Sequence, residues 1–407
     1  MKLFASSISV SLLLVLLLAP LQRAQAIVQP AFTTLPAKQN KIDNAVSDKL
    51  NSIPSSETVT VIVQLRQRAI LTDAKNLSRS ERLSKVIDEL KRTADNTQGP
   101  VNVFLGSALK EGRIKNYTPF WIINGFSVTA DTVTINEIAG LPDVLSITPD
   151  TIDIEPVSSA YFLSNPEQNI TVISAPSLWN MGYTGQDIVI ASLDSGVDLS
   201  HPELTSHWRG GANSWLDPFG QHPASPVDMS GHGTWTMGVM LGGDAGGTSI
   251  GVAPSAQWIA AKIFNDQGAS TATAIHQSYQ WLLDPDNNPS TADAPQIVNN
   301  SWDFSTPGCN LEFEPDLLAL RAAGILPVFA AGNSGPLGNT SHSPANNPSA
   351  FAVGAINNKN LIYGQSSRGP STCGGSTGAF PDVVAPGVNI NTTDLGGFYT
   401  TASGTSL

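Results

Sequence analysis

Six apolar runs, each seven or eight residues long, alternate with amphipathic stretches in the second part of the chain and restrict its fold more than any other feature. Two of the intervening stretches, 270–284 and 315–324, have the apolar spacing of surface helices. Strands that alternate with helices predict an α/β fold, in which a parallel sheet is flanked by helices. Sites in such sheets form at the carboxyl ends of strands, where the sequence places Asp194 and Asn333. The runs cover residues 187–193, 257–264, 296–302, 325–332, 350–356 and 381–387.

A smaller pattern precedes this part, and a length of 407 residues also favours more than one folded unit. Two strand–helix–strand halves over 58–155 predict a small α+β domain of the ferredoxin-like kind. The two strands of the middle segment, 118–130, are predicted to meet at Asn124 and Gly125. The predicted strands are 58–65, the pair within 118–130, and 144–155, and the predicted helices are 80–94 and 132–141.

The first 26 residues predict a secretory signal peptide. Lys2 precedes an apolar stretch from Ile8 to Ala19, and an Ala-x-Ala cleavage pattern ends at Ala26. The apolar stretch is about 12 residues long, whereas a permanent membrane helix needs about 20. We therefore expect a secreted, extracellular protein without a membrane anchor, in which a linker at 27–57 follows the signal.

Charge is distributed unevenly along the chain. Residues 1–160 hold 16 Lys+Arg and 15 Asp+Glu, whereas residues 161–407 hold 5 and 18. Such an acidic surface repels nucleic acids and anionic membranes and attracts cationic peptides. The same charge would also keep an extracellular enzyme soluble, and the sequence does not decide between these two roles.

Three separated motifs place an aspartate, a histidine and a serine after apolar or glycine-rich segments. They are IVIASLDSGVDLSHPEL at 188–204, SGHGTWTMG at 230–238 and GTSL at 404–407. A serine hydroxyl becomes a useful nucleophile when an imidazole removes its proton, and that imidazole needs a carboxylate to orient it. We interpret Asp194, His232 and Ser406 as such a catalytic triad; the alternative is three residues without a common purpose.

The glycine settings of these motifs, DSG, GHGT and SGTS, resemble those of the subtilisin-like serine proteases, the subtilases, and the surrounding segments look most like the bacillopeptidase F branch. The resemblance begins near residue 170 and shares the chain order Asp, His, Ser. It implies a serine endopeptidase that hydrolyses peptide bonds through an acyl-enzyme on Ser406 and needs no cofactor. The segment ILPVFAAGNSG at 325–335 is similar to the one that supplies the family's oxyanion ligand, which would be Asn333. Alternatively, Asn333 only tolerates a left-handed turn.

The residues around Ser301 resemble the family's substrate-binding segment, which pairs with the substrate backbone as an added strand. Ser301, Trp302 and Asp303 are therefore our candidate substrate-binding residues. Many relatives have glycines where this chain has Asp303 and Phe304. The Asp303 carboxylate either lies near the side chain before the cut bond, favouring Arg or Lys there, or points to solvent. His342, in the turn after Asn333, either approaches the same pocket or has a surface role, and we expect the surface role.

The domain at 58–155 resembles the inhibitory propeptides of subtilases, whose last segment lies in the active-site cleft; an unrelated α+β domain is the alternative. This implies a zymogen whose propeptide is its own intramolecular inhibitor, with processing in the linker at 156–169. The peptidase domain would then cover 170–407. We expect a monomer whose partners are polypeptide substrates.

Several features have weaker implications. Trp235 stands where many relatives have a second histidine, and we interpret it as local packing. Glu203 matches an acidic position that binds calcium in some relatives, and Asp244 follows in a loop, so a structural calcium ion stays open without assigned ligands. The sequence lacks zinc motifs of the C-x-x-C or H-E-x-x-H kind. Cys309 and Cys373 either form one disulfide or are two free thiols.

The chain stops one residue after Ser406, whereas in the family the serine begins a long helix. We therefore expect a C-terminally incomplete fragment of a longer chain, whose activity as given is doubtful. The competing function is a catalytically inactive relative that binds peptides or proteins through the same cleft.

Overall fold

The computed structural model describes residues 41–71, 76–156, 168–374 and 379–407. The predicted signal peptide, residues 27–40 of the predicted linker at 27–57 and most of the processing linker at 156–169 lie outside the described residues. Within the first linker, however, Asn44–Ser52 forms helix α1. Asp43 caps this helix by accepting a hydrogen bond from the Ala45 N–H, and Val46 and Leu50, one turn apart, are buried. The linker prediction is wrong here because these features support a packed helix.

The first part of the described chain contains a four-stranded antiparallel sheet, in the order β2-β3-β1-β4. This order and the sequence of elements confirm the predicted ferredoxin-like arrangement. Helix α3, which begins at a Gly-Pro pair directly after α2, was not predicted. The strands are β1 (Thr58–Leu65), β2 (Ile114–Phe120), β3 (Gly125–Asp131) and β4 (Val144–Pro149), and the helices are α2 (Arg79–Thr97), α3 (Gly99–Lys110) and α4 (Thr132–Gly140).

The single strand predicted over 144–155 is in fact two strands in different sheets. Strand β4 ends at Pro149, and the short strand β5 (Ile154–Pro156) pairs with β10 (Trp302–Phe304) instead. Between them, the Asp150 carboxylate accepts hydrogen bonds from the N–H and hydroxyl of Thr273, at 2.8 and 2.6 Å. This contact at the start of helix α9 (Ala272–Leu283) draws the chain away from its first sheet.

The second part is built on a seven-stranded sheet in the order β13-β12-β11-β9-β6-β8-β7, in which every pairing is parallel. Five of these strands lie within apolar runs and β6 extends one residue beyond its run, which confirms the predicted α/β class. The seventh, β7, has two residues and is too short to show a pattern. The strands are β6 (Val189–Asp194), β7 (Trp215–Leu216), β8 (Gln257–Lys262), β9 (Ile297–Asn300), β11 (Leu326–Ala330), β12 (Phe351–Ile356) and β13 (Val383–Pro386).

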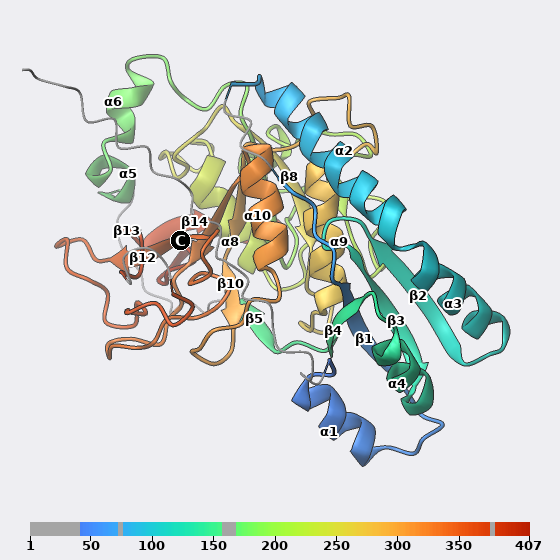
Figure 1. The fold of residues 1–407 in the computed structure, drawn as a ribbon. Coiled ribbons are helices and arrows are strands. Elements are labelled where there is room, and N and C mark those ends of the chain that lie inside the picture. The colour runs from blue at the N-terminus through green and yellow to red at the C-terminus, as the bar shows by residue number, and fades with distance from the viewer. Residues whose placement is uncertain (1–40, 72–75, 157–167, 375–378) are drawn as a thin grey trace, which may run out of the picture. The chain divides into compact units, whose positions relative to one another are not determined.

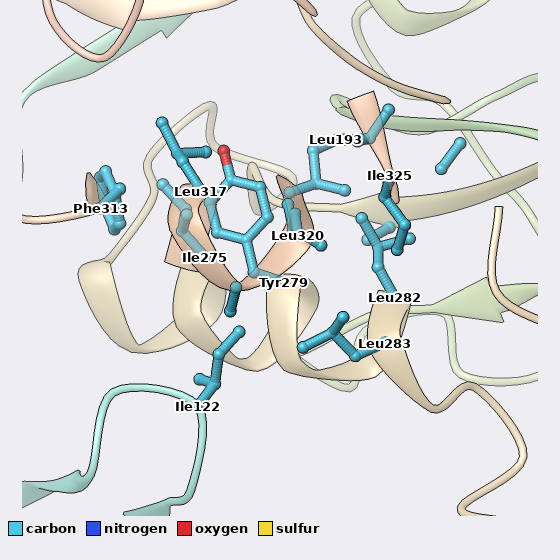
Figure 2. Close-up of a cluster of buried hydrophobic side chains, with 14 of the residues drawn as sticks. Ile122, Leu193, Ile275, Tyr279, Leu282, Leu283, Phe313, Leu317, Leu320 and Ile325 are labelled. Atoms are coloured by element: carbon cyan, nitrogen blue, oxygen red, sulfur yellow. The ribbon is translucent and has the colours of Figure 1, made fainter. Parts of the chain in front are cut away.

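The predicted helices at 270–284 and 315–324 are α9 and α10, which lie side by side (Figure 1). Figure 2 shows the Tyr279 ring of α9 among Leu193, Leu317 and Leu320. The Tyr279 hydroxyl donates a 2.8 Å hydrogen bond to Asn300, so this core also holds the end of β9. The remaining elements are α5 (Gln168–Val172), α6 (Ala175–Trp179), α7 (Pro202–Thr205), α8 (His232–Leu241), α10 (Glu314–Ala323), the hairpin β14 (Ile390–Thr393) and β15 (Tyr399–Ala402), and the 3-10 turn Leu395–Gly397.

Across the described residues, no helix combines the length and the apolar character that a membrane crossing requires.

Candidate active site

The candidate residues gather where the strand order of the large sheet reverses. From β6 the chain proceeds to β8 on one side, and β9 then returns to the other side of β6. Asp194 is the last residue of β6, and Ser301 directly follows β9. Asn333 follows the neighbouring strand β11. Crevices at the carboxyl ends of strands form at such reversal points, so the topology explains why separated motifs can share one site.

Asp194 and His232 are in direct contact. Nδ1 of His232 lies 2.8 Å from Oδ1 of Asp194, and both side chains are buried. The backbone N–H of Ser195 donates to the same oxygen at 2.7 Å. A carboxylate can only accept here, so Nδ1 carries the proton and Nε2 is the basic atom of the ring. The pair therefore has the tautomer that a general base requires.

A second buried carboxylate, Asp228, holds the start of the helix that carries His232. Helix α8 has Gly231 as its N-cap, which offers no side chain to its first N–H groups. The Ser195 hydroxyl also accepts from the Gly233 N–H at 2.9 Å, which links the end of β6 to this helix. The two Asp228 oxygens accept hydrogen bonds of 2.7–3.0 Å from the N–H groups of Ser230, Gly231 and Thr234 and from the hydroxyls of Ser195 and Thr234.

Sequence reasoning missed Asp228. Its signal was an aspartate three residues before a helix-capping glycine, a spacing typical of side chains that bind helix N-terminal N–H groups. The network fixes both the strand end at Asp194 and the helix start at His232. It therefore determines the distance between these two side chains.

Ser406 is buried beside the end of β9. Its hydroxyl oxygen lies 3.4 Å from the carbonyl oxygen of Ser301, and the Ser301 hydroxyl donates to the Ser406 carbonyl at 3.0 Å. These two contacts hold the serine backbone against the segment that precedes β10.

Asn333 is oriented by the residue before Ser406. Its Oδ1 accepts hydrogen bonds from the Thr405 N–H and the Thr405 hydroxyl, both at 3.1 Å. Since both partners donate, the amide oxygen must face Thr405 and the NH2 group is its donor end. The backbone with positive φ is that of Gly332, at 97°, and not that of Asn333. The alternative that Asn333 serves a left-handed turn is therefore wrong.

The segment after Ser301 pairs with β5 as an antiparallel strand. Trp302 lies opposite Pro156, Asp303 opposite Glu155, and Phe304 opposite Ile154. The Trp302 side chain is fully buried against Phe313 and Phe329, so this residue meets β5 with its backbone.

Asp303 and His342 are both buried next to this strand. Asp303 is 4 % exposed, which excludes the alternative that it points to solvent, and a Cβ on Gly332 would lie 2.7 Å from its Oδ2. Burial raises the pKa of the Asp303 carboxyl to about 8, and the Glu155 carboxylate adds to this increase. The surface role expected for His342 is wrong because this ring is 2 % exposed.

Hydrogen bonds explain where His342 lies. Its Nδ1–H donates to the Phe304 carbonyl at 2.7 Å, and its Nε2 accepts from the Ser334 hydroxyl at 2.8 Å. Burial lowers the pKa of His342, although the bond to Phe304 opposes the effect. The ring therefore favours its neutral form.

Other expectations have clear structural outcomes. Cys309 and Cys373 form a disulfide, so the two-thiol alternative is wrong. Trp235 is buried and donates its indole N–H to Asp394 at 2.8 Å, which confirms local packing. Glu203 accepts from the Gly246 N–H and the Tyr399 hydroxyl. No cluster of three potential metal-binding side chains occurs within the described ranges, and a structural calcium ion stays a prediction.

Comparison with known proteins defines the class. The model of the subtilase family, peptidase S8, matches residues 185–407. Subtilisin E of Bacillus subtilis is 33% identical over 73% of this chain and 70% of its own length. The chain therefore belongs to the subtilase family of serine proteases.

Two further relatives show how far the similarity extends. Bacillopeptidase F of Bacillus subtilis is 31% identical over 89% of this chain, which spans 28% of the length of that relative. A subtilisin of Bacillus pumilus is 35% identical over 58% of this chain and 78% of its own length.

Proposed function

We propose that this protein is a secreted serine endopeptidase that is made as a precursor. The observation that carries the proposal is the buried 2.8 Å contact between Asp194 and His232, in a subtilase chain that places Ser406 and Asn333 at the same sheet edge. The contacts of Ser406 with Ser301 and of Asn333 with Thr405 also support the proposal. The reaction draws on no cofactor.

In the proposed mechanism, His232 takes the proton of the Ser406 hydroxyl through Nε2 as the oxygen attacks the peptide carbonyl. Asp194 holds the ring and stabilises its charged form. The NH2 group of Asn333 donates to the oxygen that becomes negative. His232 then protonates the leaving amine, and water, activated in the same way, releases the acyl group from Ser406.

We propose that residues 58–155 are the intramolecular inhibitor, with cleavage within 156–169 and a peptidase domain from residue 170. Support comes from β5, which occupies the backbone positions that a substrate strand would use beside β10. A substrate cannot pair with β10 until this strand leaves. The mature enzyme is proposed to be an extracellular monomer that acts on polypeptides.

The proposal is tested by expressing the protein from its full coding sequence and measuring hydrolysis of casein and of peptide p-nitroanilides. We expect hydrolysis to begin after a cleavage within 156–169, identified by N-terminal sequencing. The variant Ser406→Ala should remain uncleaved and inactive. If the folded, processed protein hydrolyses no peptide, the enzyme proposal fails and the alternative of a peptide-binding relative takes its place.

A further inference from the structure

Asp303 is a buried acid without a cationic partner. Among the described residues it forms no ion pair with a Lys or Arg side chain. Its nearest basic atom is Nδ1 of His342, at 3.6 Å, and the proton on that atom is donated to the Phe304 carbonyl. A carboxylate in such surroundings is destabilised until a positive group joins it.

The Asp303 carboxylate packs against Gly332 among polar neighbours. A Cβ placed on Gly332 would meet Oδ2 of Asp303 at 2.7 Å, Oγ of Ser367 at 2.9 Å and Cδ2 of His342 at 3.0 Å. Gly332 is bonded to Asn333, the proposed oxyanion ligand. The acid therefore lies beside the reaction site.

The register of β5 shows which substrate residue would approach this acid. A substrate strand that continued the register of β5 by one residue beyond the pair of Trp302 and Pro156 would have one residue opposite Asp303 and, two positions later, one opposite Ser301. The carbonyl of Ser301 lies 3.4 Å from the Ser406 hydroxyl, so the bond after this second residue is the one next to the nucleophile. Residues two apart on a strand share a face. The second residue is thus a diagonal neighbour of Asp303, at about 7–8 Å, which long side chains can bridge.

Strand β5, which pairs with β10 at this position, places a negative charge opposite Asp303. Glu155 lies directly opposite Asp303, and its carboxylate disfavours ionisation of Asp303. Like charges that face each other across two strands are destabilising, whereas opposite charges contribute favourably. A cation near the Asp303 carboxylate would replace this repulsion with attraction, and a long side chain on the residue opposite Ser301 can bring one there from its diagonal position.

We propose that Asp303 is the specificity-determining residue of this site and selects substrates with Arg or Lys immediately before the cleaved bond. This inference rests on the proposed protease function. The substrate cation supplies the positive charge that Asp303 lacks.

The test compares kcat/KM for succinyl-Ala-Ala-Pro-X p-nitroanilides, where X is Arg, Lys, Leu or norleucine. A charge-assisted hydrogen bond predicts values about ten- to a hundredfold higher for Arg and Lys. Asp303→Asn, which keeps the shape and removes the charge, should lose this preference. The exposed Asp286→Asn removes one negative charge elsewhere and should retain it. Equal values for Arg and norleucine in the unmodified enzyme would overturn the inference.

A second measurement does not depend on catalysis. In the Ser406→Ala background, Glu155 is replaced by Lys or by Gln, and thermal unfolding is followed. Lys should raise the Tm more than Gln does, and the additional gain should vanish when Asp303→Asn is also present. Equal effects of Lys and Gln would contradict the inference. If no substrate is hydrolysed but Lys still raises the Tm more than Gln does, the proposed protease function is wrong. The preference of Asp303 for a cation would then still be supported.

Discussion

The two parts of this chain, 58–156 and 168–407, differ in what they contribute to the site. All the proposed catalytic side chains and the Asp228 network that holds them come from the second part. The first part contributes β5, which lies over β10. This difference assigns the proposed catalytic machinery to the second part, whose strand β10 is paired with β5 of the first part.

The contacts between the two parts support this division. Asp150 binds the start of α9, and Lys91 forms a 2.7 Å ion pair with Asp284 near its end. The backbone N–H groups of Trp121 and Ile122 donate to Gln280 on the same helix. None of these contacts involves a proposed catalytic residue. The first part could therefore leave without breaking a hydrogen bond of the triad.

The largest expected effect concerns the triad and tests whether the second part is catalytic. His232→Ala should lower kcat by about a millionfold, and Asp194→Ala by about ten thousandfold, as measured for the equivalent changes in subtilisin. The difference arises because the aspartate only orients and stabilises the base. Both values are measured after mild external proteolysis has removed the first part of the chain, 58–156. Circular dichroism is the folding control. Equal losses of less than about tenfold would contradict the assignment.

A smaller effect is expected at Asn333. Asn333→Ala should lower kcat by about a hundred- to a thousandfold with little change in KM, because its NH2 group acts mainly in the transition state. Thr405→Val removes one of the two donors that orient the amide and should have a weaker effect in the same direction. A rise in KM at constant kcat would assign Asn333 to substrate binding instead.

The binding of the first part, 58–156, to the second part should depend on Asp150. Asp150→Ala removes a charged acceptor for two donors of Thr273, a loss of about 1–2 kcal/mol. In the Ser406→Ala background, hydrogen exchange of the β5 amides should become about five- to thirtyfold faster. Asp48→Ala, which changes an exposed side chain on helix α1, is the matched control. If hydrogen exchange of the β5 amides is unchanged in Asp150→Ala, other contacts bind the first part to the second.

The smallest expected effect is a pH dependence of β5 pairing. Burial and, as the smaller cause, the Glu155 carboxylate raise the pKa of Asp303 to about 8 while β5 lies beside it, so pairing favours the protonated carboxyl. The contribution of the Asp303 carboxyl to the stability of β5 pairing is complete below the ordinary carboxyl pKa of about 4. It is lost as the pH rises toward about 8. Besides Glu155, His342 faces Asp303, and it favours its neutral form. Exchange of the β5 amides, corrected for intrinsic rates, should therefore accelerate from pH 5 to pH 8. Glu155→Gln should weaken this trend, and a trend in the opposite direction would exclude the mechanism.

The sequence predicted the large sheet better than the small domain, for a physical reason. Parallel strands that are buried on both faces are continuous apolar runs, which made the inner strands visible, and the edge strand β13 was also apolar although it is not buried. Helix α1 depends on a cap and two buried residues within a polar stretch, and β7 has two residues. The separation of β4 from β5 depends on the contact of Asp150 with Thr273, which is distant in the sequence.

The site shows a similar limit. The motifs around Asp194, His232 and Ser406 indicated a common chemistry because nucleophile, base and carboxylate must meet. Motifs do not show which side chains fill the space around them, so Asp228 was missed and the burial of His342 was not foreseen. For Asp303, the sequence left two directions open, and only the packing against Gly332 excludes solvent.

The most direct test of the account is to map the site of covalent labelling by a fluorophosphonate probe, which reacts with activated serines. The account predicts a single label on Ser406, identified by peptide mass spectrometry, that appears only after β5 has been removed by cleavage within 156–169. The His232→Ala variant should not be labelled. A folded, cleaved protein without label on Ser406, or with equal labelling before and after cleavage, would contradict the division into a catalytic part and its cover.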